Sequence, residues 1–290
     1  MGTAAGRALV FFGILLTVGA VFGRLRLIPG EAPSASPAGR AAARLGLFGS
    51  AAVGVGLAVL FAAQLSAFRD PFAPLGAEAA LLLSTAWGRT WSGGGLAALL
   101  AAAGFAVAAA GRGVGWGTAT LATLGLCFLP GLTGHAVATE GARTLAVLAD
   151  ALHVGAAGVW MGGLAAVLAL DAPKAPGSDG ALAHRVRVFS PWARGAVALL
   201  VATGLYASWL HVPGLWALTG SAYGVRLLLK LALVAGVAAL GWWNWTRATH
   251  RLAAGGMAAV DARRVMFVEL TLGLGVVVAF TAVLVQTAPP

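Results

Sequence analysis

Two histidines and one aspartate flank a short polar loop between two apolar segments. His135 ends the first segment, and Asp150 and His153 open the second. Asp150 and His153 are three residues apart, so on a helix they share one face. A carboxylate beside an imidazole can orient the ring or join it as a metal ligand. The pattern predicts a metal or cofactor site built on His135 and His153 with Asp150 beside them. The alternative is a pair of interfacial histidines bonded to backbone or water.

Two sulfur-bearing residues lie deeper in the same two segments. Cys127 precedes His135 by eight residues, and Met161 follows His153 by eight residues. Eight residues of helix rise about 12 Å, so both sulfur atoms are expected at a similar depth. Thiolate and thioether ligands select Cu(I), which makes a second, deeper copper station one hypothesis. Ordinary packing is the other, because methionine and free cysteine are common core residues.

The other histidines are weaker candidates for a site. His211 lies at the end of a later apolar segment, on the same predicted side, and the sequence leaves open whether it joins the others. His184 and His250 lie in polar loops beside arginines, where a solvated position is expected. No nucleophile elbow or His-Glu-x-x-His motif occurs, and no spaced carboxylate pair suggests acid–base catalysis. We therefore expect a protein that is not an enzyme.

The elements that hold these residues are expected to be membrane helices. The chain is 60% hydrophobic and only 10% charged, whereas a soluble domain carries about 25% charged residues. A spanning helix needs about 20 mainly apolar residues. Eight such segments are predicted, at 7–24, 43–65, 94–111, 115–134, 145–169, 188–210, 225–246 and 265–286. The expected fold class is all-α, a polytopic helical bundle in the lipid bilayer.

Polar connectors separate some of the predicted spans. They cover 25–42, 66–92, 171–187 and 247–264, with a short interfacial helix expected at 79–87. Gly158 and Gly162, in the fifth span, are spaced as a close-packing motif for helices. Trp160 lies well inside that span, so it is expected to face protein or a cavity. Lys230, near the start of the seventh span, is expected to extend toward the membrane interface.

The distribution of basic residues predicts the orientation of the chain. With the N-terminus outside, thirteen Lys and Arg residues fall on the inner side and six on the outer side. Inner loops of membrane proteins carry the excess of Lys and Arg, which favours an N-out and C-out topology. The same rule accounts for the net charge of +10. No nucleic-acid partner is therefore expected.

Several short motifs resemble the copper resistance protein D (CopD) family of membrane proteins. The match is specific from about residue 115 to 286 and loose over the first two spans, where only the hydropathy agrees. The residues that carry it are Gly134-His135-Ala136, Asp150 with His153, Trp160 to Leu164, Phe189-Ser190, Thr203-Gly204, Leu218 to Gly224, Leu229-Lys230, Asn244 and Arg247.

The resemblance implies an eight-helix protein of the inner (plasma) membrane that handles copper, usually described as moving it inward. It divides the chain into residues 1–92, with the first two spans, and a CopD-like six-helix core at 93–290. His135 and His153 match the family's histidine positions, whereas Cys127 does not match a family position. Such proteins often work with a periplasmic copper-binding partner, CopC. No such domain is recognised in this chain, so a separate CopC-like protein is expected.

Two other functions remain open from the sequence. A helical bundle with paired histidines can hold a b-type haem between facing helices, with His135 and His153 as axial ligands. The chain can also be a non-transporting subunit or assembly factor of a larger membrane complex. For copper itself the oxidation state is open, because imidazole suits Cu(II) and sulfur suits Cu(I).

Overall fold

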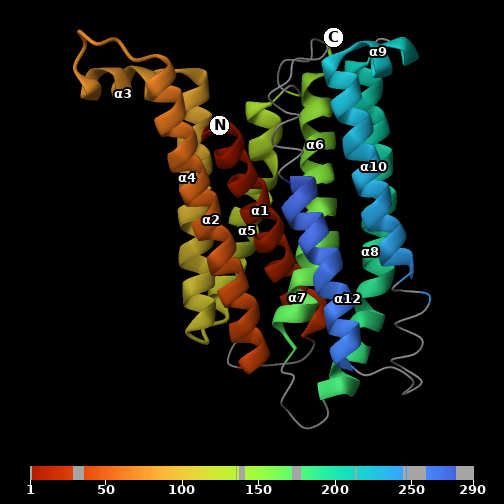
Figure 1. Ribbon diagram of the computed structural model, residues 1–290. Coiled ribbons are helices and arrows are strands. Elements are labelled where there is room, and N and C mark those ends of the chain that lie inside the picture. Colours follow the sequence, from red (N-terminus) through yellow and green to blue (C-terminus); the bar gives the residue numbers. More distant parts are fainter. Residues whose placement is uncertain are drawn as a thin grey trace.

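The computed structural model describes residues 2–28, 36–134, 136, 141–171, 178–212, 214–243, 246 and 259–278. Every regular element in this part of the chain is helical, which confirms the predicted all-α class. Figure 1 shows the long helices running side by side. The elements, with π-helical turns labelled η, are α1 Gly2–Phe22, η1 Gly23–Leu27, α2 Pro37–Ala67, α3 Leu75–Ser84, α4 Ala86–Ala109, α5 Val114–Thr133, α6 Arg143–Ala157, η3 Gly158–Gly162, α7 Gly163–Ala169, α8 Ser178–His211, α9 Leu215–Gly220, α10 Ala222–Trp243, α12 Ala259–Thr271 and η5 Leu272–Val277.

Seven of the described helical stretches are long and apolar enough to cross a membrane. They are Gly2–Leu27, Pro37–Ala67, Ala86–Ala109, Val114–Thr133, Arg143–Ala169, Gly180–Leu210 and Ala222–Trp243. In order, they overlap the first seven predicted spans. The eighth predicted span, 265–286, is helical as far as Val278, and residues 279–290 lie outside the described part. The chain is therefore a membrane protein with several spanning helices.

The predicted connectors are too long in three places, because the helices begin earlier than their apolar cores. α2 begins at Pro37, after Ser36 accepts a hydrogen bond from the Gly39 N–H at 2.9 Å. α4 begins after Thr85, whose hydroxyl accepts from the Gly88 N–H at 3.0 Å. α8 begins at Ser178, well before the predicted start at 188. Hydropathy detects only the apolar part of a helix. The helix itself extends beyond that part, to the residue that caps its end.

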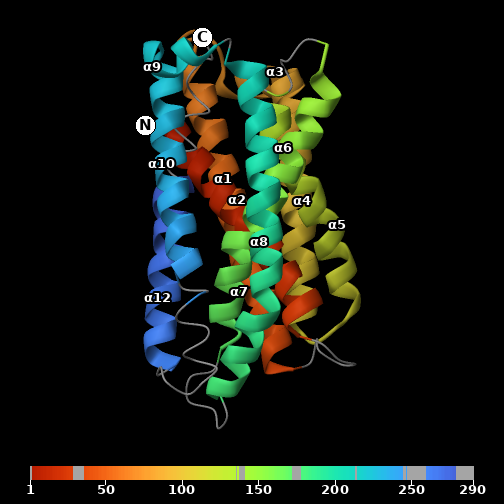
Figure 2. The same cartoon turned by 90° about the vertical axis from the view of Figure 1, so that its right-hand side faces the viewer.

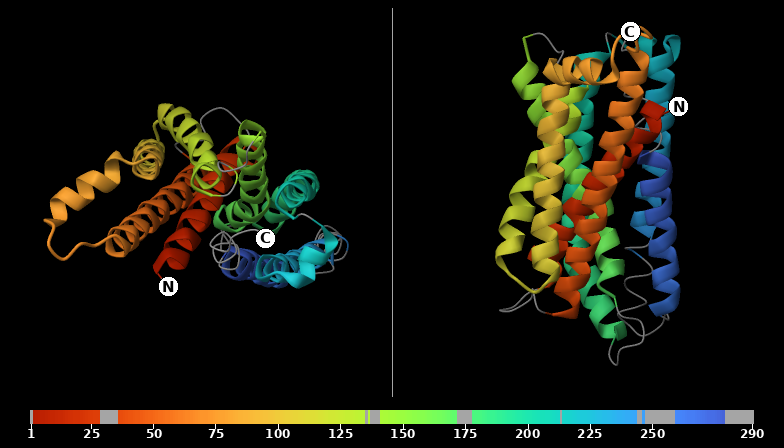
Figure 3. Two further views of the ribbon diagram at one scale, coloured as in Figure 1. Left: turned by 90° about the horizontal axis from the view of Figure 1, so that it is seen from above. Right: turned by 90° about the vertical axis from the view of Figure 1, so that its left-hand side faces the viewer.

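α1 lies in the middle of the bundle. It packs against α2, α5, α6, η3 and α7, and Figure 3 shows it from above between the α2–α4 group and the later helices. A Cβ atom placed on Gly19 would lie 2.0 Å from the carbonyl oxygen of Gly162. The backbones of α1 and η3 are therefore in direct contact. This confirms the close-packing role predicted for Gly158 and Gly162.

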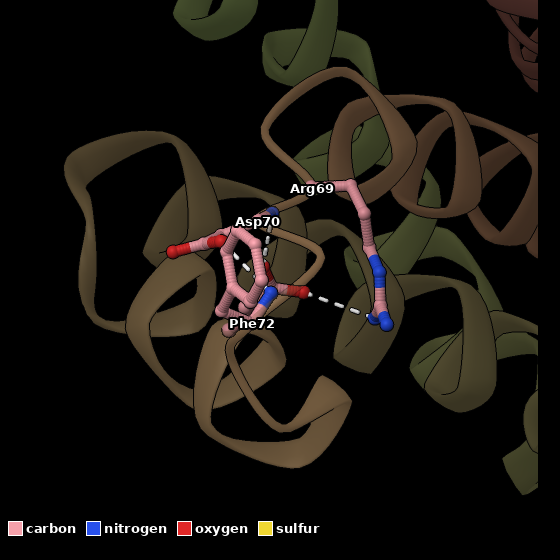
Figure 4. Close-up of polar contacts among 4 residues, drawn as sticks. Arg69, Asp70 and Phe72 are labelled. Carbon is pink, nitrogen blue, oxygen red and sulfur yellow. Dashed lines mark hydrogen bonds and ion pairs between the residues drawn. The ribbon is translucent and has the colours of Figure 1, made fainter.

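The helix α3 lies across the end of the bundle rather than along it (Figure 1). Its hairpin is held by Glu78, whose carboxylate accepts hydrogen bonds from Arg69 Nη1 at 3.2 Å and from the Asp70 N–H. Asp70 Oδ1 in turn accepts from the Phe72 N–H at 2.9 Å, within the cluster drawn in Figure 4. The Phe72 side chain is 97% exposed. An apolar helix in this position agrees with the predicted interfacial helix, shifted to Leu75–Ser84.

At the opposite end, Asp171 joins three helical segments. It lies two residues after the end of α7, pairs with Arg263 of α12 through an Nε–Oδ2 contact, and lies 3.7 Å from Arg185 of α8. The Asp171 side chain is 2% exposed, and each arginine side chain is about one-fifth exposed. Two cations thus compensate one buried carboxylate where α7, α8 and α12 meet.

Candidate functional site

A cavity of about 450 Å³ lies between α1, α5, α6, α8 and α10, in the half of the bundle that faces α3 and α9. Most of its described lining is apolar. Besides tryptophan, its polar and sulfur-bearing side chains are Thr3, Arg7, Gln64, Thr133, Asp150, His153, Met161, Thr203, Tyr206, Ser208, Tyr223 and Lys230. An apolar cavity with a few convergent polar groups is the usual form of a ligand site.

Small residues and loose helix packing keep this volume open. α10 packs on α9, α12 and η5 rather than broadly on α6 or α8, and Figure 2 shows α8 and α10 as separate helices. Glycine and alanine side chains do not fill the space between helices. Six of them line the cavity on α5, α6 and α8, namely Gly131, Ala146, Ala149, Ala157, Gly204 and Ala207.

His153 is oriented by a threonine of the neighbouring helix. Its Nδ1 lies 2.8 Å from Thr203 Oγ1 of α8. The Thr203 hydroxyl donates its single proton to the carbonyl oxygen of Leu199 at 2.7 Å, so it accepts the hydrogen bond from His153 Nδ1–H. This arrangement assigns the proton of the neutral ring to Nδ1 and leaves a lone pair on Nε2. Metal-binding histidines are held in the same way, with the other ring nitrogen donating to an oxygen.

Asp150 lies one turn before His153 and lines the same cavity. The two residues do share one helix face, as their spacing predicted. Gly131 of α5 makes room for the carboxylate, because a Cβ atom placed there would lie 3.1 Å from Asp150 Oδ2. The lack of a side chain at Gly131 therefore lets α5 and α6 approach with the carboxylate between them.

Lys230 corrects one expectation from the sequence. Its side chain lines the cavity from α10 instead of extending to the membrane interface. There it interacts electrostatically with both Asp150 and His153. The cavity thus holds a carboxylate, an imidazole and an ammonium group from two helices.

The two sulfur residues occupy different surroundings. Met161 lies in η3, lines the cavity and packs against η5, where a Cβ atom on Gly273 would meet its Sδ atom. Cys127 is buried in the core and is not among the described residues that line the cavity. Trp160 is buried and lines the cavity, as its position inside the span predicted.

The other two predicted ligands, His135 and His211, cannot be placed by their side chains in the described part of the structure. His135 lies outside the described residues, although its neighbours Gly134 and Ala136 both line the cavity. His211 ends α8, and its side chain is likewise outside the described part. Among the residues the structure describes, no three His, Cys, Asp or Glu side chains cluster as a metal site.

Comparison with known proteins identifies a family. Residues 183–284 match the family described as Copper resistance protein D, CopD. Over these residues the chain is similar to the CopD family. Thr203, Tyr223 and Lys230 lie inside the matched region, whereas Asp150 and His153 precede it. The expected resemblance to CopD is thereby confirmed.

A curated relative extends the similarity to the first spans. The chain is 30% identical to the protein named Copper transport protein CutJ from Bacillus subtilis (strain 168), over 299 aligned residues. The alignment covers 100% of this chain and 53% of the relative, so the chain spans about half the length of that protein. No solved structure matches the chain significantly.

Proposed function

We propose that this protein carries copper across the membrane and that the cavity is the place where copper enters. One observation carries the proposal: His153, held by Thr203 through Nδ1, lines a cavity that Asp150 and Met161 also line. Nitrogen and sulfur donors suit copper. Copper is the cargo here, and the residues that bind it need only hold it transiently.

The proposed path runs along α6 and η3. Copper binds His153 Nε2 with Asp150 close by, then moves toward Met161, about 12 Å further along the span. His135 and His211 remain predicted ligands near the cavity mouth. Cys127 does not line the cavity and has no place in this path. The sulfur station proposed from the sequence is thus reduced to Met161.

We further propose eight spans with both termini outside. Described arginines gather at the end opposite α3 and α9, including Arg24, Arg112, Arg185 and Arg263, and the positive-inside rule makes that end cytoplasmic. The cavity then faces the outer side, and copper moves inward. A separate periplasmic CopC-like protein is the proposed donor. Copper uptake into proteoliposomes of known orientation tests the direction.

Replacing His153 with alanine should remove copper from the purified full chain. Loss of the Nε2 ligand is expected to lower copper affinity at least tenfold, or by about 1.4 kcal/mol. Copper is measured by mass spectrometry after loading in detergent, and a visible spectrum is recorded from the same sample. His184→Ala is the matched control, because His184 is exposed and bonded to Arg187 (3.2 Å) away from the cavity. Equal copper in wild type and His153→Ala would reject the site. A Soret band lost in His153→Ala would favour the haem alternative instead.

Thr203→Val should weaken copper binding without removing it. Valine keeps the shape of threonine but cannot accept the His153 Nδ1–H hydrogen bond. Loss of such a partner typically costs about 10–100-fold in metal affinity. A competition titration of copper against a chelator measures the change. Thr133→Val is the control, since Thr133 lines the cavity but bonds only its own helix at Leu129 and Pro130. Similar losses in both variants would show that His153 orientation does not depend on Thr203.

A further inference from the structure

The charges that line the cavity are few and do not balance. Among its described lining residues, the charged side chains are Arg7, Asp150 and Lys230. Two cations and one anion leave a formal charge of +1 before any metal enters. The single carboxylate is already compensated, because Lys230 of α10 interacts with Asp150 of α6. A bound metal ion therefore gains little from Asp150.

Lys230 also shares the cavity with the proposed metal ligand His153. It interacts electrostatically with His153, whose Nε2 is the proposed ligand, as well as with Asp150. A cation bound at His153 would therefore experience the positive charge of Lys230 in the same cavity. The work of placing a cation beside a fixed charge is proportional to the charge of the cation. The repulsion energy of a divalent ion is therefore twice that of a monovalent ion at the same position.

The uncharged ligand atoms in the cavity also favour a monovalent ion. Because His153 Nδ1–H donates to Thr203, the neutral form of this imidazole has its lone pair on Nε2. Met161 supplies a thioether further along the cavity, and thioether ligands select Cu(I) over harder divalent ions. Charge and donor type therefore point to one oxidation state.

We propose that the cavity accepts copper as Cu(I), and that Lys230 sets this preference by repelling divalent cations. The inference rests on the proposed copper site at His153 and names the form of its cargo. Lys230 is a selectivity residue in this account and does not bind the metal.

The test compares a monovalent with a divalent ion on the same variants of the purified full chain. Cu(I) affinity is measured against a chromophoric chelator under reducing, oxygen-free conditions, and Zn(II) serves as a divalent ion without redox chemistry. For each ion the affinity of the variant is divided by that of wild type, so intrinsic ligand preferences cancel. Lys230→Gln should raise Zn(II) affinity about tenfold and Cu(I) affinity about threefold, because repulsion doubles with charge.

Two controls separate the charge of Lys230 from other effects. Arg226→Gln removes a cation from the same helix, and Arg226 is not among the described residues that line the cavity. It should leave both affinities unchanged. Lys230→Arg keeps the charge and should preserve the wild-type selectivity. Lys230→Leu replaces Lys230→Gln if the glutamine variant does not fold.

The outcomes distinguish this inference from the proposed function. Equal changes for Zn(II) and Cu(I) in Lys230→Gln, or the same shift in Arg226→Gln, would overturn the role of Lys230. If Cu(I) binding nevertheless depends on His153, the copper site stands. A wild-type protein that binds no Cu(I), or binds it unchanged after His153→Ala, would overturn both. The inference is supported if Lys230→Gln raises the Zn(II) affinity about tenfold and this factor is about the square of the factor for Cu(I) affinity.

Discussion

Replacing Gly162 with alanine should prevent the chain from assembling into a stable bundle. A Cβ atom at Gly162 would lie 1.8 Å from the carbonyl oxygen of Leu15 and 2.9 Å from the backbone nitrogen of Gly19. Both are backbone atoms of α1, so no side-chain rotation relieves the clash and the two helices must separate. Overpacking that side chains can absorb costs about 1–3 kcal/mol. Here we expect more than about 4 kcal/mol, seen as loss of monodisperse protein and of a cooperative thermal transition.

Gly155→Ala provides the matched control for this effect. Gly155 lies on the same span, two turns earlier, and no atom comes within 4 Å of a Cβ placed there. Alanine is a better helix former than glycine by about 0.5–1 kcal/mol, so this variant should be as stable as wild type or slightly more so. If both variants melt at the same temperature, the backbone contact between α1 and η3 does not hold the bundle together.

This contact also shows what sequence spacing can predict. The glycine motif, the membrane spans and the shared face of Asp150 and His153 all depend on residues close in sequence. Each of these predictions is confirmed by the helices that contain them. A helix repeats every 3.6 residues, so short-range spacing fixes which side chains lie together.

Partners from distant segments were not predictable in this way. Thr203 holds His153 across fifty residues of sequence, through the packing of α8 on α6. The signal was a hydroxyl within an apolar span, but nothing in the sequence places it beside His153. Lys230 likewise faces the cavity only because α10 presents that side to α6. In the sequence, Lys230 lies near the start of a predicted span, and this position is just as consistent with a side chain that extends to the membrane interface.

The sulfur pair shows a further limit of spacing arguments. Equal offsets from His135 and His153 predict a common depth for Cys127 and Met161, but they do not fix the direction around each helix. Met161 lies within the π-helical turn η3, Gly158–Gly162, which changes the rotation of its residues relative to His153 on α6. Such turns occur often at functional sites. The structure brings Met161 to the cavity and leaves Cys127 in the core.

Asp171→Ala should produce the second large effect, by releasing the end of the bundle opposite the cavity. The substitution leaves Arg185 and Arg263 without their shared carboxylate, and each of these side chains is largely buried. Removing one partner of a buried ion pair costs about 3–5 kcal/mol, because a charge stays buried without compensation. We expect about 3 kcal/mol, since both arginines retain some access to water. Thermal unfolding of the purified protein in detergent measures the loss.

Asp261→Ala tests whether burial is the cause of this effect. Asp261 lies 3.9 Å from Arg264 on α12, and both side chains are more than half exposed. Exposed pairs contribute about 0–1 kcal/mol, so this variant should unfold close to wild type. A large loss for Asp171→Ala with none for Asp261→Ala would show that the buried carboxylate ties α7 and α8 to α12. Because α12 continues into η5, which contacts Met161 through Gly273, loosening this end should also weaken the wall of the cavity. Equal losses in the two variants would instead point to a general effect of charge on α12 and α7.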